Sequence, residues 1–181
     1  MLDFSQNHFE LFGLPLSYRV DSDLLAQRYR ALQQALHPDR YAAAGDRERR
    51  LSMQASTQVN AAFQTLRDPL ARARYLLSLH IGDFNDEQEA TRDVAFLMEQ
   101  MELREALAEV EERADPMAAV GAVLDRLADH SQVLTGKLEA LPEAPSAQDL
   151  ERAREYVRKL QFIAKCRLEA EDLEAKLEGI S

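Results

Sequence analysis

The chain has 181 residues, with 22 Lys and Arg against 32 Asp and Glu, which gives a formal net charge of −10. Hydrophobic residues make up 46% of it, but no apolar run approaches the ~20 residues that a membrane-spanning helix needs, so an integral membrane protein is excluded. The single cysteine, Cys166, excludes an intrachain disulfide and a cysteine-rich zinc site, and the N-terminal residues show no secretory signal. We therefore expect a cytoplasmic protein, and the abundance of helix-forming residues predicts an all-α fold.

The charge is shared unevenly along the chain. Residues 1–80 hold 10 Lys and Arg against 8 Asp and Glu, a net charge of +2, whereas residues 81–181 hold 12 against 24, a net charge of −12. This asymmetry predicts two units, 1–80 and 91–181, joined by a linker over 81–90 that shows no apolar periodicity. An acidic surface repels phosphates, so we expect no nucleic-acid partner.

The first unit begins with a short predicted helix from Asn7 to Phe12, stopped by Gly13. A second helix is expected to begin at Asp21 or Ser22, because apolar residues then recur on one helical face at Leu25, Tyr29, Leu32 and Leu36. Arg28 and Arg30 lie off this stripe and are expected to face water. Pro38 disfavours helical geometry at His37, so the helix should end there.

A third helical pattern follows Gly45, with its apolar face at Leu51, Ala55, Val59, Ala62 and Leu66. Asp68-Pro69 is typical of a helix start, and the helix that follows should leave Arg72 and Arg74 available to solvent. These patterns predict an antiparallel pair of longer helices, joined by a loop that begins at His37.

The loop starts with His37-Pro38-Asp39-Arg40. Pro38 stiffens it, His37 can hydrogen-bond free carbonyls at the helix end, and Asp39 can offer its carboxylate to an arginine of another protein. Three such residues also suit an ordinary turn. Their position between two amphipathic helices, after a helix bearing arginines, favours a binding role.

The second unit contains three amphipathic stretches. The first runs from about Thr91 to Arg113, the second follows the cap Asp115-Pro116, and the third follows Ser146 beyond two prolines. Short connections between three helices predict an antiparallel three-helix bundle.

The first helix of this unit has two apolar sides. At ~100° per residue, one side suits a core and comprises Phe96, Leu103, Leu107 and Val110. The opposite side is apolar as well and carries interleaved carboxylates; its members are Val94, Leu97, Met98, Met101, Glu102, Glu105 and Glu109. Phe162 on the third helix can extend it. This second side predicts a partner surface, the alternative being that it packs against the first unit or the linker.

The first unit resembles a J-domain, on the strength of the His37-Pro38-Asp39 loop, its flanking helices and the Asn60–Pro69 segment. In that family the loop stimulates ATP hydrolysis by a DnaK-type chaperone. The resemblance therefore implies chaperone-binding roles for His37, Pro38 and Asp39. Arg28 and Arg30 become docking cations, with ordinary solvated surface as the alternative, and Arg40 stands where many J-domains have lysine.

Both units together resemble the HscB family of iron–sulfur co-chaperones. The resemblance rests on segments 11–15, 75–80, 96–105 and 157–162, in the family's order. It implies an adaptor that stimulates the DnaK-like chaperone HscA and binds the iron–sulfur scaffold protein IscU. The scaffold-binding positions would be Leu97, Met98, Met101, Glu102, Glu105, Glu109 and Phe162. The middle helix of the second unit and the Pro142–Pro145 connection show little similarity to the family. Since the sequence lacks N-terminal cysteine pairs, we expect no zinc-binding extension.

Two other functions are considered. An enzyme could use His37 and Asp39 as an acid–base pair, but both lie on one short loop with no nucleophile nearby, and His8, His80 and His130 form no metal-spaced motif. We expect no catalytic residue, metal or cofactor. A general J-domain co-chaperone for other clients would ordinarily carry a Gly/Phe-rich stretch or a cysteine-rich module, and neither follows His80.

Overall fold

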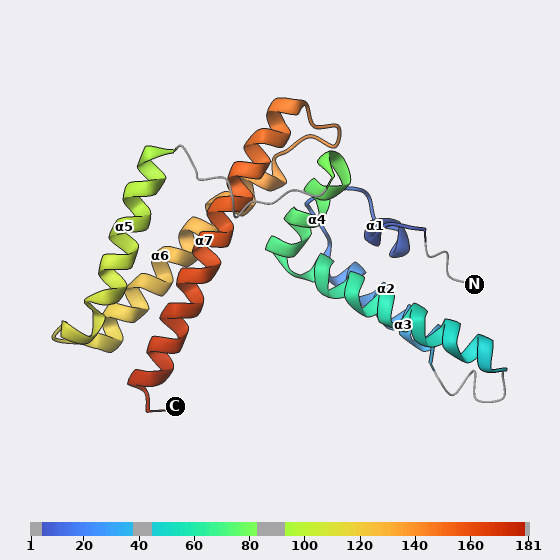
Figure 1. The fold of residues 1–181 in the computed structure, drawn as a ribbon, viewed down its shortest axis with the longest axis horizontal. Coiled ribbons are helices and arrows are strands. Elements are labelled where there is room, and N and C mark those ends of the chain that lie inside the picture. Colours follow the sequence, from blue (N-terminus) through green and yellow to red (C-terminus); the bar gives the residue numbers. More distant parts are fainter. Residues whose placement is uncertain (1–4, 38–44, 83–92, 180–181) are drawn as a thin grey trace. The chain divides into compact units, whose positions relative to one another are not determined.

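A computed structural model of the chain describes residues 5–37, 45–82 and 93–179, in which every regular element is a helix, so the all-α prediction is confirmed (Figure 1). The chain separates into two compact units, Met1–Leu79 and His80–Ser181. Most of the predicted linker, residues 83–90, lies outside the described residues. No helix in the described ranges is long and apolar enough to cross a bilayer.

Four helices form the first unit: α1 (His8–Leu11), α2 (Ser22–Ala35), α3 (Asp46–Arg67) and α4 (Pro69–Ile81). Three of their starts are fixed by the side chains that the sequence indicates. Asn7 forms a reciprocal capping box with Glu10, the Asp21 carboxylate accepts from two backbone N–H groups of α2, and Asp68 Oδ1 accepts from Ala71 N at 2.6 Å.

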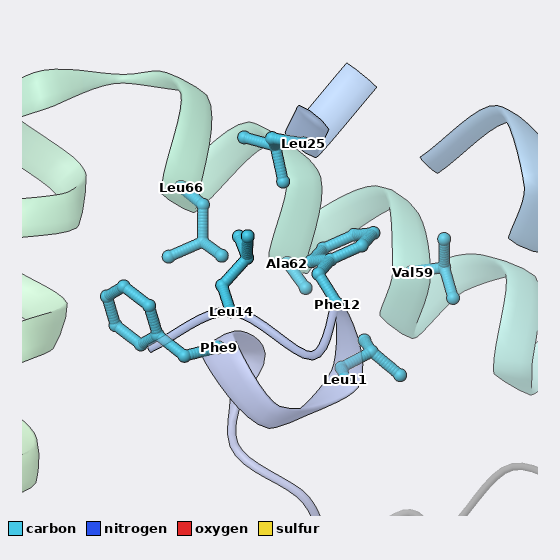
Figure 2. Close-up of a cluster of buried hydrophobic side chains, with 8 residues drawn as sticks. All are labelled: Phe9, Leu11, Phe12, Leu14, Leu25, Val59, Ala62 and Leu66. Carbon is cyan, nitrogen blue, oxygen red and sulfur yellow. The ribbon is translucent and has the colours of Figure 1, made fainter. Parts of the chain in front are cut away.

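The core of this unit lies between α1, α2 and α3. Figure 2 shows its side chains pointing toward one another from α1, the turn after it, and the facing sides of the two longer helices; they are Phe9, Leu11, Phe12, Leu14, Leu25, Val59, Ala62 and Leu66. The short helix α1 thus supplies large aromatic side chains to the hairpin. Since Gly13 adopts a left-handed backbone with φ of 58°, the chain can turn immediately and bring Leu14 back into the same core.

The exposure expected for Arg72 is wrong. Arg72 is buried, donates from Nη1 to the Leu66 carbonyl at 2.7 Å, and lies 4.8 Å from the centroid of the Tyr18 ring. It satisfies a carbonyl in the last turn of α3 and stacks on an aromatic ring, which offsets the burial of its charge. Arg74 is exposed, as expected.

The second unit comprises α5 (Val94–Ala108), the 3-10 turn η2 (Val110–Glu112), α6 (Pro116–Glu139) and α7 (Ala147–Leu177). The three long helices form the predicted bundle. Its core is built from one side of each helix, with Leu103, Val110, Val120, Leu127 and Val157 fully buried. Cys166 also lies in this core, and burial raises the pKa of its thiol, which therefore stays protonated.

The first helix of the bundle ends earlier than the predicted Arg113. The α-helix ends at Ala108, and Val110–Glu112 form a tighter turn in which Arg113 N donates to the Val110 carbonyl at 3.2 Å. This turn directs Val110 into the core before the chain reverses at Asp115, whose side chain caps α6 through Ala118 N.

Asp93 joins the start of α5 to α7. One carboxylate oxygen accepts from Phe96 N at 3.2 Å and the other pairs with Lys159 Nζ at 2.5 Å, while the same ammonium lies 5.0 Å from the Phe96 ring centroid. The hydrogen bond from Lys159, aided by that from Phe96, holds the pKa of Asp93 below its ordinary value.

We expect Asp93→Asn to lower the denaturant midpoint of the second unit at pH 7, because asparagine keeps the helix cap and loses the charge that pairs with Lys159. A lowered folded-state pKa stabilises the fold above the unfolded pKa, and this contribution is lost as pH falls through the folded pKa. The difference from wild type should therefore vanish in strong acid. Guanidinium titrations at pH 7 and in acid measure it; an equal difference at both pH values would contradict it.

Candidate functional site

The first candidate surface surrounds the C-terminal end of α2. His37 is exposed and follows directly on this end. Pro38, Asp39 and Arg40, the other predicted chaperone-binding residues of the loop, lie outside the described residues. The structure does show how α2, the helix that precedes these residues, is anchored.

A side-chain clamp joins α2 to α3. The rings of Tyr29 and Phe63 stack with centroids 3.9 Å apart, and Tyr29 OH donates to Asn60 Oδ1 at 3.0 Å. Gln33, one turn further along α2, donates to Tyr29 OH at 2.5 Å. At the end of α2, Ser52 Oγ donates to the Leu36 carbonyl at 3.0 Å. The clamp therefore fixes α2 up to the residue before His37.

The hairpin has a hollow of about 410 Å³ beside this end of α2, lined by Arg30, Gln33, Gln34, Leu36, His37 and Ser56. Arg30 is exposed, as the sequence predicts, and contributes a guanidinium to the same hollow as His37. The hollow thus combines one apolar side chain with several hydrogen-bond donors and a positive charge.

Arg28 does not face water as expected. It is half-buried, and its Nη1 donates to the carbonyls of Phe12 and Gly13, the latter at 2.6 Å. A side chain at position 13 would force this nitrogen to shift, since an added Cβ would overlap it. The geometry indicates that Arg28 stabilises the turn after α1, because its Nη1 donates to carbonyls that the helix leaves open.

The second candidate surface is the outer side of α5. We call Val94, Leu97, Met98 and Met101 the α5 patch; their exposed fractions are 68%, 40%, 60% and 72%. Phe96 and Leu103, on the opposite side of the same helix, are 5% and 0% exposed. The helix therefore buries one of its two apolar sides and presents the other.

The predicted acidic neighbours of the patch have different surroundings. Glu102 pairs with Arg126 of α6 at 2.8 Å, and Glu109 pairs with Arg113. Glu105 is exposed. Two α6 residues that the sequence did not single out thus border the patch, Arg126 and, through its contact with Glu99, His130. Arg126 and His130 are four residues apart, so the sequence could have placed them on one side of α6. It could not have shown that this side faces α5.

Phe162 is half-buried and packs edge-on against Phe96, with centroids 5.7 Å apart. The guanidinium of Arg104 lies 5.5 Å from the centroid of the Phe162 ring. Phe162 therefore belongs to the packing interface between α5 and α7 as well as to the margin of the α5 patch. Truncating it would remove packing in addition to any partner contact.

Comparisons with known proteins cover both units. The HSCB C-terminal oligomerisation domain family matches residues 92–171. A protein named co-chaperone protein HscB homolog from Photobacterium profundum is 44% identical over 172 residues, which are 93% of this chain and 96% of that one.

Two solved structures are also similar. The chaperone HscB from Vibrio cholerae has a TM-score of 0.84 and 44% identity, covering 94% of this chain and 99% of its own. The crystal structure of human co-chaperone protein HscB has a TM-score of 0.83 and 31% identity, covering 97% of this chain and 84% of its own.

We expect Ser52→Ala to lower the free energy of unfolding of the first unit by about 1–2 kcal/mol, because it leaves the Leu36 carbonyl without its partner beside a buried position. Thr57→Ala, which removes a hydroxyl bonded to the Met53 carbonyl on the exposed side of the same helix, is the matched control and should cost less than about 0.5 kcal/mol. Urea unfolding of both variants makes the comparison, and equal losses would contradict the clamp at the end of α2.

Proposed function

The chain belongs to the HscB family of co-chaperones, and from that membership we propose that it couples the iron–sulfur scaffold protein IscU to the DnaK-like chaperone HscA and stimulates the chaperone's ATPase. The observation that carries the proposal is the exposed α5 patch on a bundle attached to a unit bearing the His37-Pro38-Asp39 loop. One chain then offers two separate binding surfaces.

The chaperone surface of this proposal centres on His37, Pro38 and Asp39, with Arg30 as a docking cation. The exposure of His37 and its place in one hollow with Arg30 support the assignment. Arg40 would add charge to the loop. Arg28 is assigned a role in stabilising the turn after α1 instead, since its Nη1 is engaged with two backbone carbonyls. An arginine held in this way can support the docking surface through contacts within its own chain, without contacting the chaperone itself.

The scaffold surface is the α5 patch with Glu102, Glu105, Glu109 and Phe162 at its margins. Methionine side chains repack readily and suit a surface that must fit another protein. An exposed contiguous apolar patch on a protein otherwise rich in charge is typical of a binding site, because leaving it in water is unfavourable. Glu102 and Glu109 are paired with Arg126 and Arg113, so it is the exposed Glu105 that would favour a partner with positive charge beside the apolar contact.

Coupling two weak contacts on one molecule raises the local concentration of the client at the chaperone, and no bond needs to be made or broken by the adaptor. We therefore propose a non-enzymatic, cytoplasmic role in the maturation of iron–sulfur proteins, with no cofactor of its own and neither nucleic acid nor membrane as a partner. The cluster belongs to the scaffold as cargo. A general J-domain co-chaperone acting on other clients is the alternative, and it would not require the α5 patch.

We expect His37→Gln to abolish stimulation of the chaperone's ATPase while leaving scaffold affinity and thermal stability unchanged, because His37 is exposed and lies in the other unit from the patch. Steady-state ATPase assays with and without scaffold measure it. His80→Gln, at an exposed histidine at the end of α4, is the matched control and should stimulate normally. Loss of scaffold binding by the His37 variant would indicate a structural role.

We expect Met98→Ala and Met101→Ala together to weaken scaffold binding at least about tenfold, because they remove apolar surface from the centre of the proposed contact. Both side chains are exposed, so the free energy of unfolding should change by less than about 0.5 kcal/mol. Calorimetric titration and urea unfolding test the two statements. Unchanged affinity would favour the general co-chaperone, and a large loss of stability would show that the patch serves packing.

A further inference from the structure

The helix next to α5 also has exposed side chains on the edge that contacts α5. Two cross-helix contacts fix the alignment of α5 with α6: Glu99 with His130, and Glu102 with Arg126 at 2.8 Å. A step of three residues forward along α5 corresponds to four residues backward along α6. The helices are therefore antiparallel, and residues beyond His130 on α6 lie alongside the beginning of α5.

Val133 occupies that position. Arg126, His130 and Val133 are separated by four and three residues, the spacing that places side chains on one edge of a helix. Since the first two contact α5, Val133 lies on the α5-facing edge as well, one turn beyond His130 and level with residues 94–98. It is 56% exposed, so its side chain lies on the surface of the bundle and not in the core.

The two carboxylates between Met98 and Val133 each contact a side chain of α6. The Glu99 carboxylate contacts the His130 ring, and Arg126 neutralises Glu102. A partner that covers the surface between Met98 and Val133 does not have to bury an isolated carboxylate there, which would oppose binding. This surface can thus lie under an apolar contact. Covering the exposed Glu105, further along α5, would be less favourable.

The size of a protein interface points the same way. A stable interface buries about 800 Å² on each partner and uses roughly 20 residues a side, which is more than the outer side of one helix of four turns presents. A second helix edge beside the patch widens the apolar area. Leu168, 62% exposed on α7, does not serve this purpose, because it follows Phe162 by six residues and so lies about 240° around the helix from it.

We propose that Val133, on the edge of α6 formed by Arg126 and His130, is part of the scaffold-binding surface and contacts the apolar centre of the same partner as the α5 patch. This proposal rests on the proposed function and extends it from the first and third helices of the bundle to the middle one. The partner it requires has an apolar surface wide enough to span two antiparallel helices.

Val133→Ser in the full-length chain tests the proposal, with Leu168→Ser as the matched control: both replace one exposed aliphatic side chain in a long helix of the same bundle. Calorimetric titration with the scaffold protein should show affinity reduced about 3- to 10-fold by Val133→Ser and by less than about 1.5-fold by Leu168→Ser. Thermal unfolding of both variants should match, which removes misfolding as the cause.

The double variant of Met98 and Met101 serves as reference in the same titration. If it loses affinity while Val133→Ser binds like wild type, the extension to α6 is overturned and the proposed function stands. If the reference variant and Val133→Ser both bind normally, the proposed function fails as well. An equal loss in Val133→Ser and Leu168→Ser would also overturn the proposal, because the effect would then not depend on the position of Val133.

Discussion

A helix in a small bundle can bury one side against its neighbours and must present the other to water, and α5 carries apolar residues on both sides. Packing of Phe96 and Leu103 against the rest of the bundle decides which side is buried, and it leaves Val94, Met98 and Met101 exposed. Burying both sides would need another layer of protein. The exposed side therefore has a free energy cost that covering by a partner would relieve.

The first unit meets a different requirement, which is to anchor the helix that ends just before His37. It does so with polar contacts as well as with the apolar core. Hydrogen bonds among Tyr29, Asn60 and Gln33 join the middle of α2 to α3, and Ser52 Oγ donates to the Leu36 carbonyl at the end of α2. Hydrogen bonds with defined directions restrict sliding and rotation of one helix on another more tightly than apolar contacts alone. The residue before His37 is consequently well anchored.

Ion pairs in the bundle determine how the acidic surface can be used. A net charge of −12 over residues 81–181 suggests a uniformly acidic face. Arg126 of α6 and Lys159 of α7 instead pair with Glu102 and with Asp93, the residue that caps α5, so part of this negative charge is compensated within the bundle. Such pairs at the surface contribute little to stability individually. Their effect is to pair Glu102 and Asp93 within the bundle, beside the α5 patch.

Much of this protein follows from local sequence alone. Caps such as Asp21 and Ser146 and the apolar spacing of each segment depend on neighbours within one or two turns, so the helices, most of their starts and the two-sided character of α5 were predictable. The start of α5 is an exception, because this helix begins at Val94 and the prediction was about Thr91. The surroundings of long polar side chains were not. Arg28 and Arg72 look like surface residues on a helical wheel, yet they bind carbonyls brought near by the turn after α1 and by the end of α3. The contacts of Arg126 and His130 with α5, and hence the place of Val133, likewise depend on the alignment of two helices. That alignment is set by how their side chains interlock in three dimensions, which the order of residues along either helix does not specify.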